Sequence, residues 1–163
     1  MAGFHTKRFK KHDDYMTPKH AWEAIDEFIP KDKVIWEAFY GDGTSGTDLT
    51  AMGHNVIHEE IDFFEHDLGD VIVSNPPFSL VKDIMPRLEE TKKPFILLMP
   101  SSKIVASYIR NFKGDIQIII PRKRIHFTKV SADGTKTDTN KCNFDCFYYC
   151  HGIGLPKDVI WLM

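Results

Sequence analysis

The chain has 163 residues, a formal net charge of −2, 42% apolar residues and 27% charged residues. This length fits one domain that buries roughly two thirds of its unfolded surface, so it needs no disulfide or metal for stability. No apolar run approaches the ~18 residues of a membrane-spanning helix, and no apolar stretch follows the basic first residues as in a secretory signal, so we expect a cytoplasmic or nuclear protein.

Residues 1–14 are polar and basic without an apolar period, and we interpret them as a mobile basic arm. Thr17 and Pro18 then look like the N-cap and first position of a helix that Pro30 ends. The next run, 33–39, contains Glu37 and Phe39 and is nearly continuous in apolar residues, which predicts a strand covered on both faces.

The first strand leads into a glycine-rich turn, Phe39–Gly46, and a short helix carrying Leu49 and Met52. Glycines such as Gly41 and Gly43 let a backbone turn tightly and approach a ligand, while a helix amino terminus offers free N–H groups. The turn lacks the GK[ST] phosphate cradle and the GxGxxG spacing, so ATPase and dinucleotide interpretations are weak.

A second strand, 54–58, ends in a group of acidic residues. An acidic side chain about 20 residues after a glycine loop is placed to accept hydrogen bonds from ribose hydroxyls. We favour Glu60 for this role, with Glu59 and Asp62 as alternatives, and Phe63 following Asp62 could face an adenine ring. The alternative that these acids are only exposed loop residues stays open.

The third strand, 70–74, runs directly into Asn75-Pro76-Pro77-Phe78. Proline donates nothing to a strand ladder, so the tetrapeptide must project from the carboxyl end of that strand, which is where ligands bind in open α/β sheets. Together, an amide oxygen, a rigid backbone carbonyl and a flat ring suit a planar group that carries an NH2, such as adenine.

The remaining chain alternates helical and extended segments. We predict helices over 79–90 and 103–112, the latter with Ile104 and Val105 facing inward, and strands over 95–99 and 115–120. Two late extended segments, 124–127 and 143–150, are joined by 130–141, which we predict to be a mobile loop. This alternation predicts a doubly wound α/β fold without a second domain.

Three cysteines, Cys142, Cys146 and Cys150, lie in one late apolar segment. Their odd number argues against a disulfide framework, and a spacing of four is not a familiar zinc pattern. We therefore predict buried thiols on one strand face and assign no metal.

Charge is distributed unevenly along the chain. Residues 57–81 contain six acidic residues and no Lys or Arg, whereas basic residues cluster at the start and late in the chain. This separation fits an acidic small-molecule site flanked by basic segments that follow a phosphate backbone, although a solvated surface is an equal alternative. The basic residues considered for nucleic-acid binding are Lys7, Arg8, Lys10, Lys11, Arg122, Lys123, Arg124 and Lys136.

The order of these motifs resembles that of the S-adenosylmethionine-dependent N6-adenine DNA methyltransferases, over nearly the whole chain and most like the small stand-alone enzymes of phages and other viruses. The resemblance implies a Rossmann-like, mostly parallel sheet of about seven strands, with an antiparallel late strand and helices on both faces. It is carried by Tyr15-Met16-Thr17-Pro18, Phe39-x-Gly41-x-Gly43, Glu60, Asp62-Phe63-Phe64, Asn75-Pro76-Pro77-Phe78 and Arg124-Ile125-His126-Phe127.

The resemblance also implies roles, with S-adenosylmethionine as cofactor and DNA as partner. Asn75 and the Pro76 carbonyl would accept hydrogen bonds from the target amine, and Phe78, held by Pro77, would stack on the flipped or unpaired target base. The cofactor-binding residues would be Tyr15, Thr17 and Pro18 at the methionine moiety, Gly41 and Gly43 at its amino-acid end, Glu60 at the ribose, and Asp62 and Phe63 at the adenine, together with Glu37, Phe39 and Asn75.

One departure from the family concerns target recognition. After the predicted late strand only residues 152–163 follow, so we expect residues 15–163 to be a single catalytic domain without a separate target-recognition domain. Specificity would then come from loops, the basic arm, a homodimer or a partner subunit. The alternatives to DNA methylation are methylation of adenine in RNA, methylation of protein glutamine, and a catalytically silent scaffold that binds cofactor or nucleic acid.

Overall fold

A computed structural model describes residues 15–130, 136–138 and 143–163 of the chain. The predicted basic arm, 1–14, and parts of the predicted loop 130–141 lie outside these described residues. No helix in the described part of the chain is long and apolar enough to cross a membrane.

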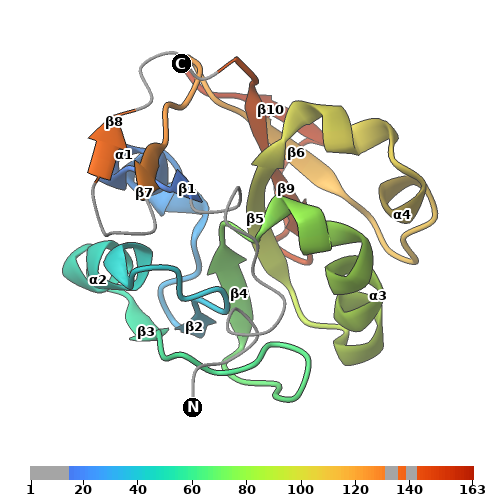
Figure 1. Ribbon diagram of the computed structural model, residues 1–163. Helices are drawn as coiled ribbons and strands as arrows, with labels where there is room; N and C mark the ends of the chain where they lie inside the picture. The colour runs from blue at the N-terminus through green and yellow to red at the C-terminus, as the bar shows by residue number, and fades with distance from the viewer. Residues whose placement is uncertain (1–14, 131–135, 139–142) are drawn as a thin grey trace.

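The described chain is organised around a seven-stranded sheet (Figure 1). All neighbouring strands pair in parallel except β9, which is antiparallel to both β5 and β6. The predicted α/β, Rossmann-like arrangement with an antiparallel late strand is thus confirmed. In spatial order the strands are β3 (Asn55–Ile57), β2 (Val34–Trp36), β4 (Val71–Ser74), β5 (Phe95–Pro100), β9 (Cys146–His151), β6 (Gln117–Ile120) and β10 (Val159–Trp161).

The strand order reverses between β2 and β4. From β2 the chain passes to β3 on one side, and it then returns to form β4 on the other side of β2. Such a switch point leaves a crevice at the carboxyl ends of the two strands, where open α/β sheets bind ligands. The residues that follow β2 and β4 are therefore brought to one place.

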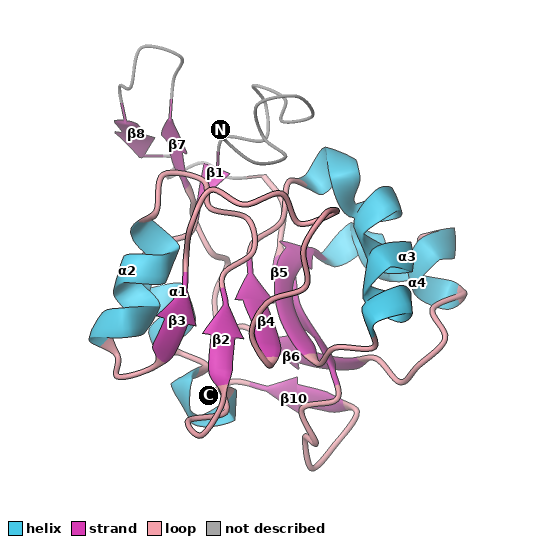
Figure 2. Ribbon diagram, turned by 90° about the horizontal axis from the view of Figure 1, so that it is seen from below, coloured by secondary structure: helices cyan, strands magenta, loops and turns pink. Residues whose placement is uncertain are grey.

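Helices cover both faces of the sheet (Figure 2). The helices α1 (Lys19–Glu23) and α2 (Thr44–Ala51) pack on one face, and α3 (Val81–Thr91) and α4 (Ser107–Arg110) pack on the other. The buried strand β5 shows why both faces must be covered: Phe95, Leu97 and Met99 belong to one core cluster, and Ile96 and Leu98 belong to the other. This alternation follows from the two-residue period of a strand.

A second, three-stranded sheet was not predicted. It consists of β1 (Tyr15–Met16), β7 (Thr128–Val130) and β8 (Lys136–Asp138), all antiparallel. The interpretation of 130–141 as a plain loop is therefore wrong where β7 pairs with β8. Strands this short and polar lack a clear apolar period, so the pairing of β7 with β8 leaves no local signal. The pairing of β7 with β1 joins residues more than one hundred positions apart.

Some predicted helix boundaries are also wrong. Thr17 does not cap α1, because Pro18 occupies the N-cap position, and the predicted helix up to Pro30 is interrupted, with a 3-10 turn, η3 (Asp26–Phe28), after α1. Likewise, helix 79–90 begins with a 3-10 turn, η4 (Phe78–Leu80).

The predicted helix 103–112 is two elements. A 3-10 helix, η5 (Ser101–Val105), ends at Ala106, whose extended backbone (φ −68°, ψ 148°) starts α4. One extended residue breaks the 3.6-residue period, so the residues before it lose register with those that face the core. Ile104 and Val105, expected inside, are 40% and 62% exposed.

Two of the three cysteines can be placed. Cys146 and Cys150 are thiols buried on β9 and part of the same core cluster, as predicted for thiols on one strand face. Cys142 lies outside the described residues. Among the described residues, no three His, Cys, Asp or Glu side chains gather closely enough to hold a metal ion.

Candidate functional site

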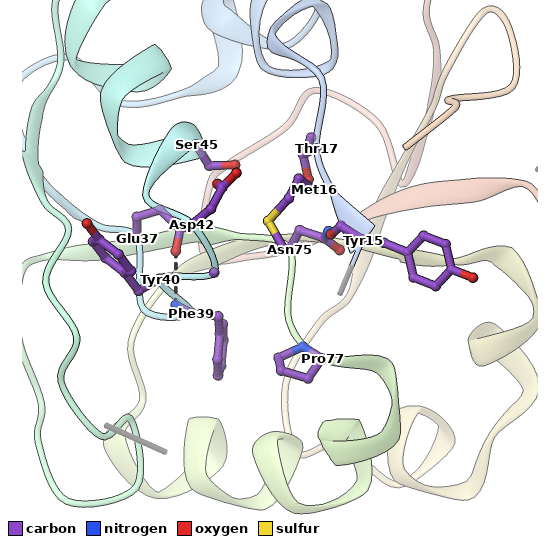
Figure 3. A pocket seen from close by; sticks show the side chains of 11 residues that line it. Tyr15, Met16, Thr17, Glu37, Phe39, Tyr40, Asp42, Ser45, Asn75 and Pro77 are labelled. Atoms are coloured by element: carbon purple, nitrogen blue, oxygen red, sulfur yellow. Dashed lines mark hydrogen bonds between the residues drawn. The ribbon is translucent and has the colours of Figure 1, made fainter. Parts of the chain in front are cut away.

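A small cavity lies at the switch point between β2 and β4 (Figure 3). It is enclosed by four segments: β1 with the residue after it, the end of β2 with the glycine loop, the start of α2, and the end of β4. The site therefore combines residues that are more than sixty positions apart in the chain. Its lining residues are Tyr15, Met16, Thr17, Glu37, Phe39, Tyr40, Gly41, Asp42, Ser45, Asn75 and Pro77.

Glu37 is a buried carboxyl group directly after β2, only 2% exposed. Its Oε1 accepts a hydrogen bond from the backbone N–H of Phe39 at 2.9 Å, and the Ser74 hydroxyl lies 2.9 Å from each of its oxygens. Burial raises the pKa of Glu37 to about 8, although the hydrogen bonds from Ser74 and Phe39 oppose the shift. At neutral pH the carboxyl group is therefore mostly protonated.

Asn75 follows β4 and is oriented by a single contact. Its Nδ2 donates a hydrogen bond to the backbone carbonyl of Tyr15 at 3.2 Å. A carbonyl can only accept, so the amide nitrogen must face Tyr15. The other end of the amide, Oδ1, is buried and has no hydrogen-bond partner in the described part of the chain. An unpaired buried acceptor costs free energy, so this atom marks a place for a donor from a ligand.

A second unpaired polar atom lies in the same lining. The hydroxyl of Thr17, a residue that is 3% exposed, has no partner among the described residues. Seven buried side-chain polar atoms lack a partner among the described residues, and two of them, the Thr17 hydroxyl and Asn75 Oδ1, belong to residues that line this one cavity. Both could pair with polar groups of a bound ligand.

The glycine loop brings its backbone close to the cavity. Gly41 and Gly43 have positive φ values of 60° and 83°, which side chains with a Cβ rarely adopt. A Cβ on Gly43 would lie 2.7 Å from the hydroxyl of Tyr40, and one on Gly41 would lie 3.0 Å from the sulfur of Met16. The loop is thus shaped by its glycines, as the sequence indicates, and Tyr40 and Met16 close over it.

The cavity beside Asn75 is narrow, with about 20 Å³ of free space, and the Met16 side chain points into its centre (Figure 3). On the other side of Thr17 a larger cavity of about 290 Å³ shares Met16, Thr17 and Asp42 with it and adds Pro18. A ligand larger than a water molecule would therefore require the Met16 side chain to move.

Phe78 belongs to a cluster of rings next to Asn75. Its ring contacts those of Phe127 and Phe144 edge to face, with centroids 6.4 and 6.0 Å apart. Tyr15 contacts the same two rings at 6.5 and 6.4 Å. Edge-to-face contacts hold rings at fixed angles, so Phe78 and Tyr15 present a rigid aromatic wall.

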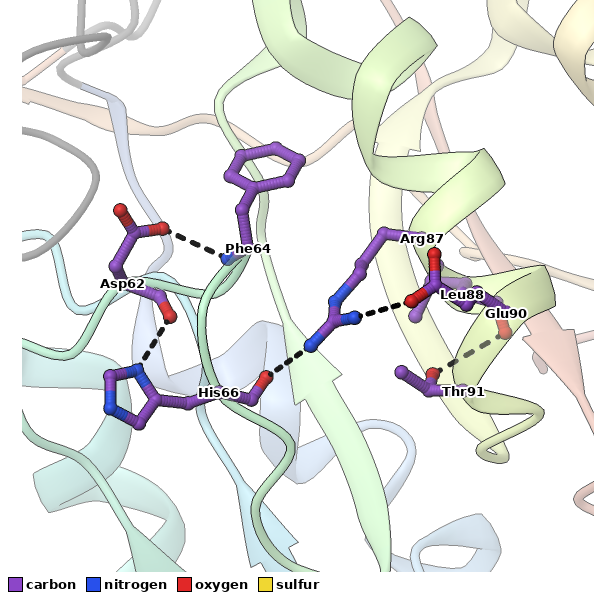
Figure 4. A network of polar contacts seen from close by, with 7 residues as sticks. All are labelled: Asp62, Phe64, His66, Arg87, Leu88, Glu90 and Thr91. Carbon is purple, nitrogen blue, oxygen red and sulfur yellow. Dashed lines mark hydrogen bonds and ion pairs between the residues drawn. The ribbon is translucent and has the colours of Figure 1, made fainter.

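The residues expected at the ribose and adenine do not line this cavity. Glu60 is exposed after β3, and Phe63 is 2% exposed, packed between Trp36 and Phe39 with centroids 5.8 and 4.9 Å away. Asp62 forms a local turn, in which its carboxylate accepts a hydrogen bond from Phe64 N–H at 2.9 Å. The same loop is tied to α3, because Arg87 donates to the carbonyl of His66 at 3.0 Å (Figure 4).

The predicted basic residues are only partly described. Arg122 and Lys123 are exposed directly after β6, whereas Arg124 forms an ion pair with Asp145 at 2.8 Å that holds the pKa of this carboxyl group below its usual value. Lys136 lies in β8, where its backbone pairs with Val130. Lys7, Arg8, Lys10 and Lys11 fall outside the described residues.

Comparisons with known proteins identify no family. No protein-family model and no curated protein sequence match the chain. A solved structure similar to it is precorrin-6y C5,15-methyltransferase from Geobacter metallireducens GS-15, at 8% sequence identity and a TM-score of 0.47, covering 87% of this chain and 96% of that chain. A likeness this remote says nothing about substrate.

The sequence therefore located most of the cavity but missed some residues. The structure brings together Tyr15, Thr17, Glu37, Phe39, Gly41, Asn75 and Pro77 at one cavity, with Pro18 beside it. Met16 was missed although it stands within the Tyr15–Pro18 motif, and Tyr40, Asp42 and Ser45 were missed although they stand within the glycine loop that was singled out. Ser74 and Phe144 had no local signal, because their roles depend on contacts with distant residues.

Proposed function

We propose that this chain is an S-adenosylmethionine-dependent methyltransferase that acts on the exocyclic N6 amine of adenine in DNA. The observation that carries the proposal is the Asn75 amide: its nitrogen is held by the Tyr15 carbonyl, and its buried oxygen lacks a donor among the described residues. A planar NH2 group supplies such a donor.

The chemistry of the turn supports an amine substrate. The lone pair of an aromatic amine is delocalised into the ring, which makes the amine a poor nucleophile. Hydrogen bonds from the amine to Asn75 Oδ1 and to the Pro76 carbonyl favour a tetrahedral nitrogen and localise its lone pair for attack. No strong base is needed, because fixing the amine in line with its target lowers the barrier.

The residues around the cavity fit S-adenosylmethionine as cofactor. When bound, it would supply an electrophilic methyl group on a sulfonium sulfur and leave as the neutral thioether S-adenosylhomocysteine, and the methylated amine would lose a proton to water. The glycine loop allows close backbone approach, the Thr17 hydroxyl offers an unpaired hydrogen-bonding group, and Glu37 offers a carboxyl group for an ammonium group. Glu60 and Asp62 remain proposed contacts for the ribose and adenine, since they follow β3, next to β2 in the sheet.

Adenine as the target is supported by the rings beside Asn75. Phe78 stands at the start of η4, held in place by Phe127 and Phe144. A base stacked on a fixed ring recovers part of the few kcal/mol needed to leave a duplex. We therefore propose that the target adenine is flipped out of a duplex or is unpaired.

The test is transfer of a labelled methyl group. The protein is incubated with radiolabelled S-adenosylmethionine and, separately, with unmethylated DNA, unmethylated RNA or total protein, and the products are digested and chromatographed. We expect label in N6-methyladenine from DNA. Label only in RNA or glutamine would replace the proposed substrate, and cofactor binding without transfer to any of the three would make the chain a silent scaffold.

A further inference from the structure

A second, much larger cleft lies near the other end of the sheet. It has a volume of about 570 Å³ and is formed by α1, η3, the segment after β6, and the edge strand β10 with the residues after it. Most of its lining is apolar, and two of its rings, Phe28 and Trp161, are not buried. Trp161 is 68% exposed, which is unusual for a tryptophan and indicates a place where another ring can stack.

The charges of the cleft are on its walls. The segment after β6 contributes Arg122, Lys123 and Arg124 to the lining, and α1 and η3 contribute His20 and Glu27. Arg124 is engaged by Asp145, whereas Arg122 and Lys123 are exposed. An apolar interior with cations along one wall is complementary to a flat base attached to a phosphate.

The basic segment that lines the cleft lies at the same edge of the sheet as Asn75. Arg122 follows the carboxyl end of β6, and Asn75 follows the carboxyl end of β4. The strands between them are β5 and β9, so β4 and β6 are three strand spacings apart. At about 4.8 Å per spacing this is about 14 Å, a distance that a few nucleotides of an extended strand can span.

We propose that this cleft binds an unpaired nucleotide of the substrate strand, with the base beside Trp161 and its phosphates along Arg122 and Lys123, while the target adenine occupies the site at Asn75. The inference rests on the proposed function and adds to it a second contact with single-stranded nucleic acid. It gives the candidate site at Asn75 a second means to hold its substrate strand.

The fluorescence of Trp161 can report binding in the cleft directly. The other two tryptophans of the chain, Trp22 and Trp36, are 0% and 1% exposed, so an oligonucleotide can quench only Trp161 by stacking. The probe is oligothymidylate, which contains no adenine and so tests the cleft without methyl transfer. We expect saturable quenching of tryptophan emission that Trp161→Phe removes.

Two variants test the contributions of the ring and of the basic residues that line the cleft. Trp161→Ala is expected to weaken oligothymidylate binding, measured by fluorescence anisotropy, by about tenfold. Arg122→Gln with Lys123→Gln is expected to weaken it and to reduce the slope of log affinity against log salt by about 1.4, for two phosphate contacts on a single strand. The matched control is Lys82→Gln with Lys113→Gln, which removes two exposed cations elsewhere and leaves binding unchanged.

The outcomes separate the two proposals. Methyl transfer to an adenine oligonucleotide without quenching by oligothymidylate would overturn the cleft proposal and leave the proposed function intact. Quenching that Trp161→Ala weakens, without methyl transfer to any substrate, would support the cleft and overturn the catalytic proposal. A dimer that Trp161→Ala dissociates, with no quenching by oligothymidylate, would assign the cleft to a second copy of the chain instead.

Discussion

Glu37 and Ser74 join the ends of β2 and β4, since the Ser74 hydroxyl lies 2.9 Å from both carboxyl oxygens of Glu37. Ser74 directly precedes Asn75, so this contact fixes the start of the Asn75-Pro76-Pro77-Phe78 turn. The same carboxyl group accepts a hydrogen bond from Phe39 N–H at the start of the glycine loop. One buried group thus positions both halves of the candidate site, and its protonation state matters to both.

The pH dependence of stability should report Glu37. Its pKa is about 8 in the folded chain against an ordinary value of 4.5, so between these values the folded state holds a proton that the unfolded state loses. The contribution of Glu37 to stability therefore falls as pH rises from about 4.5 to about 8. In urea unfolding at several pH values across this range, Glu37→Gln should remove this part of the decline, because glutamine does not titrate. Parallel pH profiles of the two proteins would contradict the assignment.

Cofactor binding should release a proton near pH 7. An ammonium group placed beside Glu37 favours the carboxylate and lowers the pKa of Glu37 from about 8. Calorimetric titration with S-adenosylhomocysteine, which carries the same amino-acid group, should then give enthalpies that depend on the ionisation enthalpy of the buffer, with release approaching one proton. Glu37→Gln should abolish the buffer dependence. Equal enthalpies in all buffers for the unmodified protein would place the ammonium group elsewhere.

Asn75→Ala should abolish methyl transfer while it leaves cofactor affinity nearly intact. The substitution removes the unpaired acceptor Oδ1 and also the hydrogen bond to the Tyr15 carbonyl. We expect the transfer rate to fall by a factor on the order of 10² or more, as for the loss of one positioned hydrogen-bonding group in other active sites. Single-turnover transfer and calorimetry with S-adenosylhomocysteine measure the two effects. A comparable loss of cofactor affinity would instead make Asn75 a cofactor contact or a structural residue.

Gly43→Ala should destabilise the chain more than Gly53→Ala. Both glycines have positive φ, 83° and 100°, so both substitutions incur backbone strain of about 1–2 kcal/mol. Only Gly43 has a neighbour in the way: its Cβ would lie 2.7 Å from the Tyr40 hydroxyl, whereas nothing lies within 4 Å at Gly53. Overpacking should add about 1–3 kcal/mol at Gly43, measurable by urea unfolding. Equal losses would show that Tyr40 moves aside freely.

The sequence by itself determined the layered α/β fold and the place of the candidate site. Runs of apolar residues such as those of β4 and β5 are continuous because both faces of a parallel sheet are covered, and this is a local pattern. The proline pair after Asn75 ends β4 wherever the strand lies in the sheet. The apolar periods and the positions of proline therefore predicted which residues stand at strand ends. They did not predict where short helices end, because the extended backbone of Ala106 interrupts the run of apolar residues that predicted one helix over 103–112.

Only the tertiary structure decided how those strand ends meet. The contact between Asn75 and Tyr15 joins residues sixty positions apart, and the contact between Ser74 and Glu37 joins residues 37 positions apart. The pairing of β1 with β7 holds Tyr15 in place and lies beyond any local pattern. The change of strand order at the switch point brings the ends of β2 and β4 side by side. Polar groups buried there are shielded from water, so hydrogen bonds between them are favoured. The acceptor of Asn75 that has none among the described residues is the feature that directs attention to a ligand.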